Sequence, residues 1–194
     1  MDTKDPQRSF QPTKRVIVLI DLAGCAKAFQ TEGDEKMVAF LQDYYVACEK
    51  IVTGRGGAVI KFIGDACLAV FASDRAKSAV EAVLELQSTI AMLAKRRQVQ
   101  VALGANLHRS FAIEAEFGAG SSKRRDILGR GVNQTFLLGR GSGIRISEPV
   151  YRALPSSARS PWSKHEPPAV YHLNSPHGIL EGLGKDPVTN ALRW

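Results

Sequence analysis

Two short apolar segments that flank Gly64-Asp65 constrain the fold of this chain most strongly. They are rich in aliphatic and aromatic residues, as strands are, and the glycine between them suits a tight turn. The segments therefore predict an antiparallel hairpin with strands Ala58–Phe62 and Ala66–Ala72.

The segments around this hairpin extend the pattern. The β-branched run Val16–Ile20 predicts a fully buried strand. Apolar residues at helical spacing predict one helix over Asp34–Val52 and a second from Ser73 or Asp74 to about Ala94. With a fourth strand at 99–107, the order is β-α-β-β-α-β, a ferredoxin-like core of the α/β (α+β) class.

The second half of the sequence predicts C-terminal additions to this core. The expected elements are a strand at 111–117, a loop at 118–125, a helix at 132–138, a strand at 144–147, a helix at 149–154 and a closing strand at 169–173. We expect one domain over residues 14–173, with a flexible N-terminal tail at 1–13 and a C-terminal tail at 174–194.

The composition bounds the class of protein. Among 194 residues, 44% are hydrophobic and 23% are charged, as in soluble globular domains. No apolar run is long enough to cross a bilayer, and the polar start lacks the apolar stretch of a secretion signal, so a cytoplasmic location is expected. The three scattered cysteines predict neither a disulfide framework nor a metal cluster.

The chain is basic, with a formal net charge of +7 and a sequence pI of about 9.5. Clusters at 95–97 and 123–125 carry much of this charge. Such a balance favours polyanionic partners, including a triphosphate or nucleic acid. The alternative is that both clusters are solvated helix-end or loop surfaces.

Two carboxylates follow buried segments. Asp21 ends the first strand and Asp65 lies in the hairpin turn, and in this strand order the two side chains could converge. Converging carboxylates repel each other unless a cation lies between them, and oxygen ligands favour Mg²⁺ or Mn²⁺. The alternative is that each serves only its local turn.

Several motifs resemble those of class III adenylyl and guanylyl cyclases. Residues 19–26, with Asp21 third, are similar to the family's F-x-D-I-x-G-F-T signature. Residues 56–71 match the block G-G-x-x-x-K-x-x-G-D-x-x-x-A-x-F closely. Residues 126–133 resemble D-x-x-G-x-x-V-N, and 144–151 resemble the following strand and helix. The resemblance covers about residues 14–173 and implies a cyclase homology domain.

This resemblance implies a reaction and roles for individual residues. A cyclase attacks the α-phosphate of a nucleoside triphosphate with the ribose 3′-hydroxyl and releases pyrophosphate, assisted by two metal ions per site. Asp21 and Asp65 match the metal ligands, Lys61 and Asp126 the base-recognition pair, and Asn133 the residue that orients the ribose. Lysine with aspartate suits adenine, so ATP is the expected substrate and cyclic AMP the product.

Lys61, Asp126 and Asn133 each have a simpler interpretation as well. Lys61 could be a solvated lysine at a strand end, and Asp126 a partner of the neighbouring Arg124 or Arg125. Asn133 could cap its helix.

The resemblance also implies a homodimer with two shared sites. Asp21 and Asp65 would come from one protomer, and Lys61, Asp126 and Asn133 from the other. An attached or separate regulatory or sensor domain would fit such a catalytic domain.

One departure from the family concerns catalysis. Leu137 occupies the position of the family's transition-state arginine. Arg140, almost one turn further, could replace it or could be a solvated helix-end residue. Lys164 matches the family's late phosphate-binding lysine in a loose alignment, and His108 is expected to pack or cap.

Leu137 defines the main alternative function, a catalytically weak or inactive domain that binds nucleotide or dimerises to regulate a partner. An RNA-binding ferredoxin-like module is a third possibility. It agrees with the basic pI, but the strands lack the exposed aromatic pairs that stack bases, so no nucleic-acid partner is expected.

Overall fold

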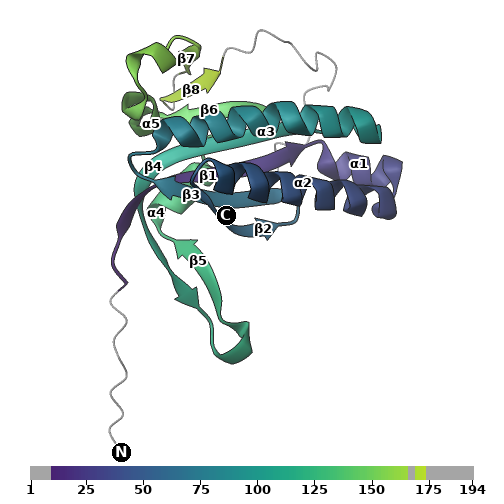
Figure 1. The fold of residues 1–194 in the computed structure, drawn as a ribbon, viewed down its shortest axis with the longest axis horizontal. Coiled ribbons are helices and arrows are strands. Elements are labelled where there is room, and N and C mark those ends of the chain that lie inside the picture. The colour runs from purple at the N-terminus through teal and green to yellow at the C-terminus, as the bar shows by residue number, and fades with distance from the viewer. Residues whose placement is uncertain (1–9, 166–168, 174–194) are drawn as a thin grey trace, which may run out of the picture.

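The computed structural model describes residues 10–165 and 169–173. An open sheet of eight strands is arranged in the order β2-β3-β1-β4-β6-β8-β7, and β5 extends from β4 (Figure 1). The strands are β1 (Thr13–Ala23), β2 (Ala58–Ile63), β3 (Ala66–Ala72), β4 (Ala102–Phe117), β5 (Arg124–Leu128), β6 (Gly143–Ser147), β7 (Trp162–His165) and β8 (Val170–Leu173). The helices are α1 (Cys25–Glu32), α2 (Asp34–Gly54), α3 (Ala76–Arg97), α4 (Arg130–Phe136) and α5 (Glu148–Ala153), with 3-10 turns at Gly120–Ser122 and Ser156–Ala158.

The main core lies between the sheet and the two long helices α2 and α3, which run side by side (Figure 1). Phe40 and Tyr44 of α2 and Leu86 and Ile90 of α3 are fully buried there. The helical spacing that predicted these two helices therefore identified the faces that pack on the sheet. The predicted hairpin and buried first strand are also present, with β1 between β3 and β4.

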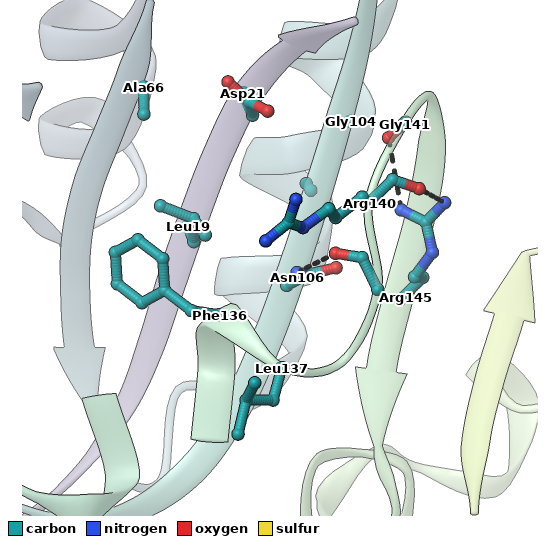
Figure 2. A pocket seen from close by; sticks show the side chains of 12 residues that line it. Leu19, Asp21, Ala66, Gly104, Asn106, Phe136, Leu137, Arg140, Gly141 and Arg145 are labelled. Atoms are coloured by element: carbon teal, nitrogen blue, oxygen red, sulfur yellow. Dashed lines mark hydrogen bonds between the residues drawn. The ribbon is translucent and has the colours of Figure 1, made fainter. Parts of the chain in front are cut away.

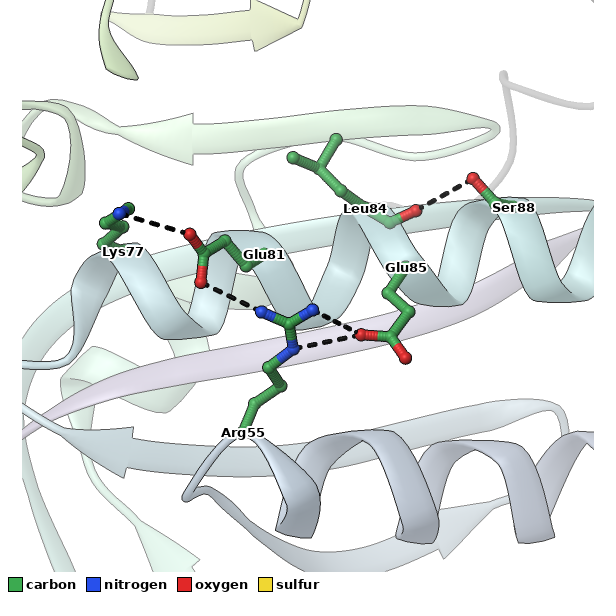
Figure 3. Close-up of polar contacts among 6 residues, drawn as sticks. All are labelled: Arg55, Lys77, Glu81, Leu84, Glu85 and Ser88. Atoms are coloured by element: carbon green, nitrogen blue, oxygen red, sulfur yellow. Dashed lines mark hydrogen bonds and ion pairs between the residues drawn. The ribbon is translucent and has the colours of Figure 1, made fainter. Parts of the chain in front are cut away.

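A bridge at the helix ends joins α2 to α3. Arg55, which follows α2, donates to Glu85 at 2.7 and 3.0 Å and to Glu81 at 3.1 Å on α3 (Figure 3). These side chains are exposed and screened by water, so the ion pairs contribute little to stability. Burial of the apolar helix faces stabilises the layer far more.

The opposite face of the sheet is only partly covered. A second, small cluster of buried residues lies there, under α4 and beside β5: Ile17, Leu68, Val70, Ala112, Ile127 and Val132. The rest of this face carries Asp21 and the neighbouring polar residues. The functional residues predicted from the sequence therefore have an open face on which to gather.

A β-bulge in β2 decides where Lys61 points. Val59 pairs with Ala69, but Lys61 pairs with Leu68, so one residue of β2 is left over. Regular alternation from Val59, which packs in the main core, would turn Lys61 towards the helices. The bulge places it opposite Leu68 instead, on the open face.

Several predicted elements differ from the structure. The two strands expected at 99–107 and 111–117 are one continuous strand, β4, which bends away from the sheet with β5 as a two-stranded arm (Figure 1). The loop expected at 118–125 ends in β5, and the helix expected at 132–138 is α4 at 130–136. α1 and β7 were not predicted.

The ends of the chain were predicted as tails. Residues 1–9 and 174–194 lie outside the described residues, whereas the ring of Phe10 stacks on Phe117 of the arm with centroids 5.7 Å apart. Among the described residues, no helix has both the length and the apolar character needed to cross a membrane.

Candidate functional site

Asp21 and Asp65 interact electrostatically on the open face. Asp21 lies in β1 just after the buried run, opposite Gly104 of β4. Partial burial raises the pKa of Asp21, and the charge of Asp65 raises it further, against a hydrogen bond from the backbone of Leu22 and the charge of Arg140. The charges of Asp21 and Asp65 therefore act on each other within one chain, and their joint role as metal ligands stays a prediction.

Cys25, at the start of α1, lies beside both carboxylates. Burial, then the charge of Asp65 and a hydrogen bond with it, raises the pKa of the Cys25 thiol to about 12. The thiol is therefore protonated at neutral pH, while the carboxylates remain as hard oxygen donors. All three cysteines are free and buried, in agreement with the expectation of no disulfides.

These two carboxylates fit a hard divalent cation in part. Their repulsion is the usual signature of a site that a cation neutralises. Within the described ranges, no group of three or more His, Cys, Asp or Glu side chains forms a metal-binding set. A metal ion held by Asp21 and Asp65 would take its remaining ligands from water or from the phosphates of a substrate.

A cavity of about 370 Å³ opens next to Asp21, between β1, β4 and the segment after α4 (Figure 2). Its polar lining comes from Asp21, Asn106, Arg140 and Arg145. Figure 2 shows the Arg140 side chain directed into this space, and in this view its guanidinium lies between Asp21 and Asn106. The cavity thus combines a carboxylate that suits a metal with a cation that suits phosphate.

Lys61 and Asp126 form a direct pair. The Lys61 Nζ donates to Asp126 Oδ2 at 2.7 Å, between β2 and β5. The other oxygen of Asp126 accepts the Ile127 backbone N–H at 2.7 Å. The sequence gives the two residues complementary charges, and the bulge in β2 and the arm bring them into contact although they are 65 positions apart.

The alternatives for these two residues disagree with the geometry. Lys61 is ion-paired and not simply solvated. Asp126 does not pair with its neighbours, because Arg125 bonds to Glu114 and Arg124 donates to the carbonyls of Ser121 and Lys123.

Asn133 and Leu137 lie one turn apart around the end of α4. The residue at the helix N-cap is Gly129, so Asn133 does not cap the helix. Leu137 follows the last helical residue and is 78% exposed at the rim of the cavity. An exposed leucine at this position supplies no charge to a phosphate.

Lys164 lies near one edge of the sheet. It is in β7, opposite Tyr171 of β8, whereas Lys61 is in β2 at the other edge. The phosphate-binding role expected for Lys164 stays a prediction.

His108 lies on the open face of β4 between two hydrogen-bonding neighbours. Its Nδ1 lies 2.9 Å from Ser147 Oγ and its Nε2 lies 2.9 Å from Gln134 Oε1. Burial lowers the pKa of His108, and the Gln134 contact opposes this shift. His108 thus joins β4, β6 and α4, as expected for a packed residue.

Most residues of the two basic clusters form ion pairs at the surface. Arg96 and Arg97, in the last turn of α3, bond to Asp43 of α2 at 3.6 and 2.6 Å. Lys123 pairs with Glu116 at 2.9 Å, and Arg125 pairs with Glu114 on the arm. This geometry agrees with the simpler interpretation of both clusters.

Gly104, Asn106 and Arg145 also line the cavity and were not identified from the sequence. Gly104 lies in a strand with no signal of its own, and the motif that contains Arg145 assigns this residue no role. Asn106 could have been noticed as a polar residue inside an apolar run, since such a residue needs a partner when it is buried.

Comparison with known proteins supports the resemblance of the motifs. No family model matches the chain. It is 25% identical over 156 residues to an adenylate cyclase of Anabaena cylindrica, covering 73% of this chain and 31% of the relative. It is 27% identical over 157 residues to adenylate cyclase 2 of Rhizobium meliloti (strain 1021), covering 71% and 43%. The chain thus spans less than half the length of either curated relative.

Solved structures share the fold. The adenylyl cyclase CyaB from P. aeruginosa superposes with a TM-score of 0.75 at 17% identity over 88% of this chain and 98% of that one. The guanylyl cyclase Cya2 gives 0.75 at 19% identity over 84% and 92%. A class III adenylyl cyclase-like ATP-binding protein from Pseudomonas aeruginosa gives 0.68 at 17% identity over 77% and 36%.

The chain therefore resembles class III adenylyl and guanylyl cyclase catalytic domains in sequence, and it has their fold. Both adenylyl and guanylyl cyclases share this fold, so the fold alone does not select the base.

Proposed function

We propose that this chain is a nucleotidyl cyclase domain that converts ATP to cyclic AMP and pyrophosphate. The observation that carries the proposal is the bonded pair of Lys61 and Asp126, which occupies one part of the open face while Asp21 and Asp65 occupy another. The first pair offers a donor and an acceptor, as a base edge requires. The second pair offers hard anionic ligands, as the metal ions of a triphosphate require.

The residues divide the chemistry between recognition and charge. Lys61 donates to N1 of adenine, and Asp126 accepts from the exocyclic amine, an arrangement that guanine does not match. The side-chain amide of Asn133 orients the ribose. A divalent cation, when bound at Asp21 and Asp65, activates the 3′-hydroxyl and neutralises the phosphates.

A homodimer completes the site in this proposal. Lys61 and Asp65 are only four positions apart in the β2–β3 hairpin, yet Lys61 pairs with Asp126 and Asp65 interacts with Asp21. A two-fold dimer brings the Lys61–Asp126 pair of one protomer over the Asp21–Asp65 pair of its partner, twice. A monomer would hold only half of each site and would be inactive.

The test is incubation of the purified protein with ATP or GTP and manganese, followed by chromatographic detection of cyclic nucleotide. We expect cyclic AMP from ATP and its loss, by more than about a thousandfold, in Asp65→Ala. Asp74→Ala, which removes an exposed carboxylate before α3, is the matched control. Full activity of Asp65→Ala with an intact fold would contradict the metal assignment.

A second function is favoured by Leu137. Without an arginine at this position, the domain could bind ATP and regulate a partner without turnover, and one structural neighbour is described as an adenylyl cyclase-like ATP-binding protein. The same assay separates the two functions. Bound ATP with no cyclic product at high protein concentration would support the regulatory function over the enzyme.

A further inference from the structure

We propose that Arg140 binds the triphosphate in the cavity of its own protomer, on the same side of the shared site as Asp21 and Asp65. Lys61, Asp126 and Asn133 would reach that site from the partner. The inference rests on the proposed function and specifies which protomer supplies the phosphate-binding cation. The inference follows from the hydrogen bonds that fix residues 139–143, which we call the arginine loop.

Arg145 fixes the shape of the arginine loop. Its guanidinium donates to the carbonyls of four loop residues: Arg140 at 2.5 Å, Ser142 at 3.0 Å, Gly141 at 3.2 Å and Gly143 at 3.5 Å. Burial lowers the pKa of Arg145. Because its donors are occupied by carbonyls, Arg145 is a positioning residue and not itself a phosphate ligand.

Two residues of strand β4 contact the arginine loop. The side-chain amide of Asn106 donates to the Gly139 carbonyl at 2.8 Å. Gly104 leaves room for the loop, because a Cβ at this position would lie 2.1 Å from the Gly141 carbonyl oxygen. The loop is thus anchored at its beginning by Asn106, in its middle by contact with Gly104, and along its length by Arg145.

The cavity also contains an unpaired acceptor. Asn106 is only 4% exposed, and its Oδ1 has no hydrogen-bond partner among the residues that the structure describes. A buried carbonyl oxygen without a hydrogen-bond partner destabilises the folded state. Because Asn106 lines the cavity, a polar ligand there can satisfy this atom.

Arg140 itself is left available by this anchoring. Within the described part of the chain, no hydrogen bond or ion pair involves its guanidinium, and only its backbone carbonyl is bonded. Arg140 and Asp21 line the same cavity, and Figure 2 shows the Arg140 guanidinium in the space beside Asp21, with no ion pair between them. A guanidinium held beside a metal-binding carboxylate is placed to bind the phosphates that the metal also binds.

Position in the fold distinguishes Arg140 from Leu137. Asn133 and Leu137 are one helical turn apart around the end of α4, so they face the same way. Arg140 follows the helix, past Gly139, and turns back over β4 of its own chain (Figure 2). Leu137 thus lies at the rim of the cavity beside Asn133, whereas Arg140 extends into the cavity beside Asp21, so under the proposal the cation serves the half of the site that carries Asp21.

Mixed dimers test which protomer Arg140 serves. The strongly impaired variants Asp65→Ala and Lys61→Ala are mixed first, and shared sites predict recovery to about a quarter of the wild-type rate, because half of the dimers are mixed and each has one of its two sites intact. Failure of this control mixture would contradict the shared site and hence the proposed function.

Arg140→Ala is then mixed with each of the same two partners. If Arg140 acts with its own Asp65, the mixture with Lys61→Ala recovers activity and the mixture with Asp65→Ala does not. The reverse pattern would overturn the inference, since it would place Arg140 in the partner's half of the site.

Ligand binding tests the same inference without turnover. We expect inorganic tripolyphosphate with magnesium, followed by calorimetry, to bind Arg140→Ala at least about tenfold more weakly than wild type. Arg96→Ala, which removes an exposed arginine from the end of α3, is the matched control and should bind as wild type does. Equal affinities for Arg140→Ala and wild type, or no binding to wild type, would overturn the inference.

The positioning role of Arg145 has its own readout. Arg145→Lys keeps the charge but cannot donate to four carbonyls, so tripolyphosphate affinity should fall nearly as far as in Arg140→Ala. The double variant should bind no more weakly than Arg140→Ala alone, because both changes remove one interaction. Additive losses would show that Arg145 does not act through Arg140.

Discussion

Two regions of the open face carry opposite electrostatic arrangements. At the Lys61–Asp126 pair, opposite charges lie 2.7 Å apart and neutralise each other. At the cavity, Asp21 and Asp65 repel each other, and Arg140 lies near them without a bridge. The first region is complete within one chain, whereas the second contains charges that are not balanced by close partners.

The difference shows how one sheet face can be prepared for two tasks. In the proposed function, Lys61 and Asp126 would give up their mutual hydrogen bond for bonds to the edge of a base, so little rearrangement would accompany binding. Unbalanced carboxylates cost stability in the free protein, and a cation recovers that cost when it binds. The comparison therefore predicts that the two regions respond differently to mutation and to metal.

Of the three further tests of this comparison, the one on the Lys61–Asp126 pair should give the largest effect. Lys61→Ala should lower kcat/KM for ATP by about 10- to 100-fold, because it removes a charge-assisted donor and leaves Asp126 without its partner. Steady-state kinetics with ATP and GTP measure the loss. Lys77→Ala, which removes an exposed lysine paired with Glu81, is the control and should behave as wild type.

A double change sharpens the same test. Replacing Lys61 by Glu and Asp126 by Cys, the residue types expected in guanylyl cyclases, should shift the preference from ATP towards GTP. An unchanged preference in this variant would show that the pair does not contact the base.

An intermediate effect is expected at the metal carboxylates. Asp65→Asn removes the repulsion with Asp21, so the metal-free variant should melt a few degrees higher than wild type, since about 1 kcal/mol corresponds to roughly 2–4 °C in a domain of this size. Manganese should raise the melting temperature of wild type and have little effect on the variant. Thermal melts with and without manganese measure both, and Asp74→Asn is the control.

The opposite result would be informative as well. If manganese stabilised Asp65→Asn as much as wild type, the ion would bind elsewhere, and the contrast between the two regions would not depend on metal.

The smallest expected effect is on the arm that carries Asp126. Burial raises the pKa of Glu114, but hydrogen bonds and charges from Arg125 and Arg15 outweigh it, so the net shift is downward. A lowered folded-state pKa gives stability that is present above the unfolded pKa and is lost as pH falls through the folded value. Glu114→Gln should therefore cost about 1 kcal/mol at neutral pH and progressively less in acid.

Urea denaturation of both proteins at about pH 7 and about pH 3 measures this difference. A constant difference between Glu114→Gln and wild type across this range would show that the charge of Glu114 is not what stabilises the arm.

Sequence pattern predicted the elements whose apolar periodicity is long or sharply bounded. The helices α2 and α3 and the β2–β3 hairpin follow from spacing, turn glycine and β-branched residues. α1 was not predicted, because it is short and its only buried residues are Cys25 and Ala28, which give too weak an apolar pattern. The single long strand β4 was split in two because the polar residues in its middle interrupt the apolar run.

Some residues of the candidate site could be identified from the sequence and others could not. Asp21, Asp65, Lys61 and Asp126 were identified because each lies in a motif of recognisable residue types. Arg145 and Asn106 were not, because their roles depend on carbonyls of a loop that has no sequence signature. Lys164 was placed with the site by alignment, and strand order puts it at the opposite edge of its own sheet.

The sequence by itself determined the strand and helix order, the hairpin and the types of charge available to the site, because local periodicity and turn chemistry act over a few residues. Only the tertiary structure decided where those charges point. The bulge turned Lys61 from the core to the open face, and the arm brought Asp126 to it across 65 positions. The anchored loop directed Arg140 towards Asp21. These outcomes depend on packing between distant segments, which no local pattern encodes.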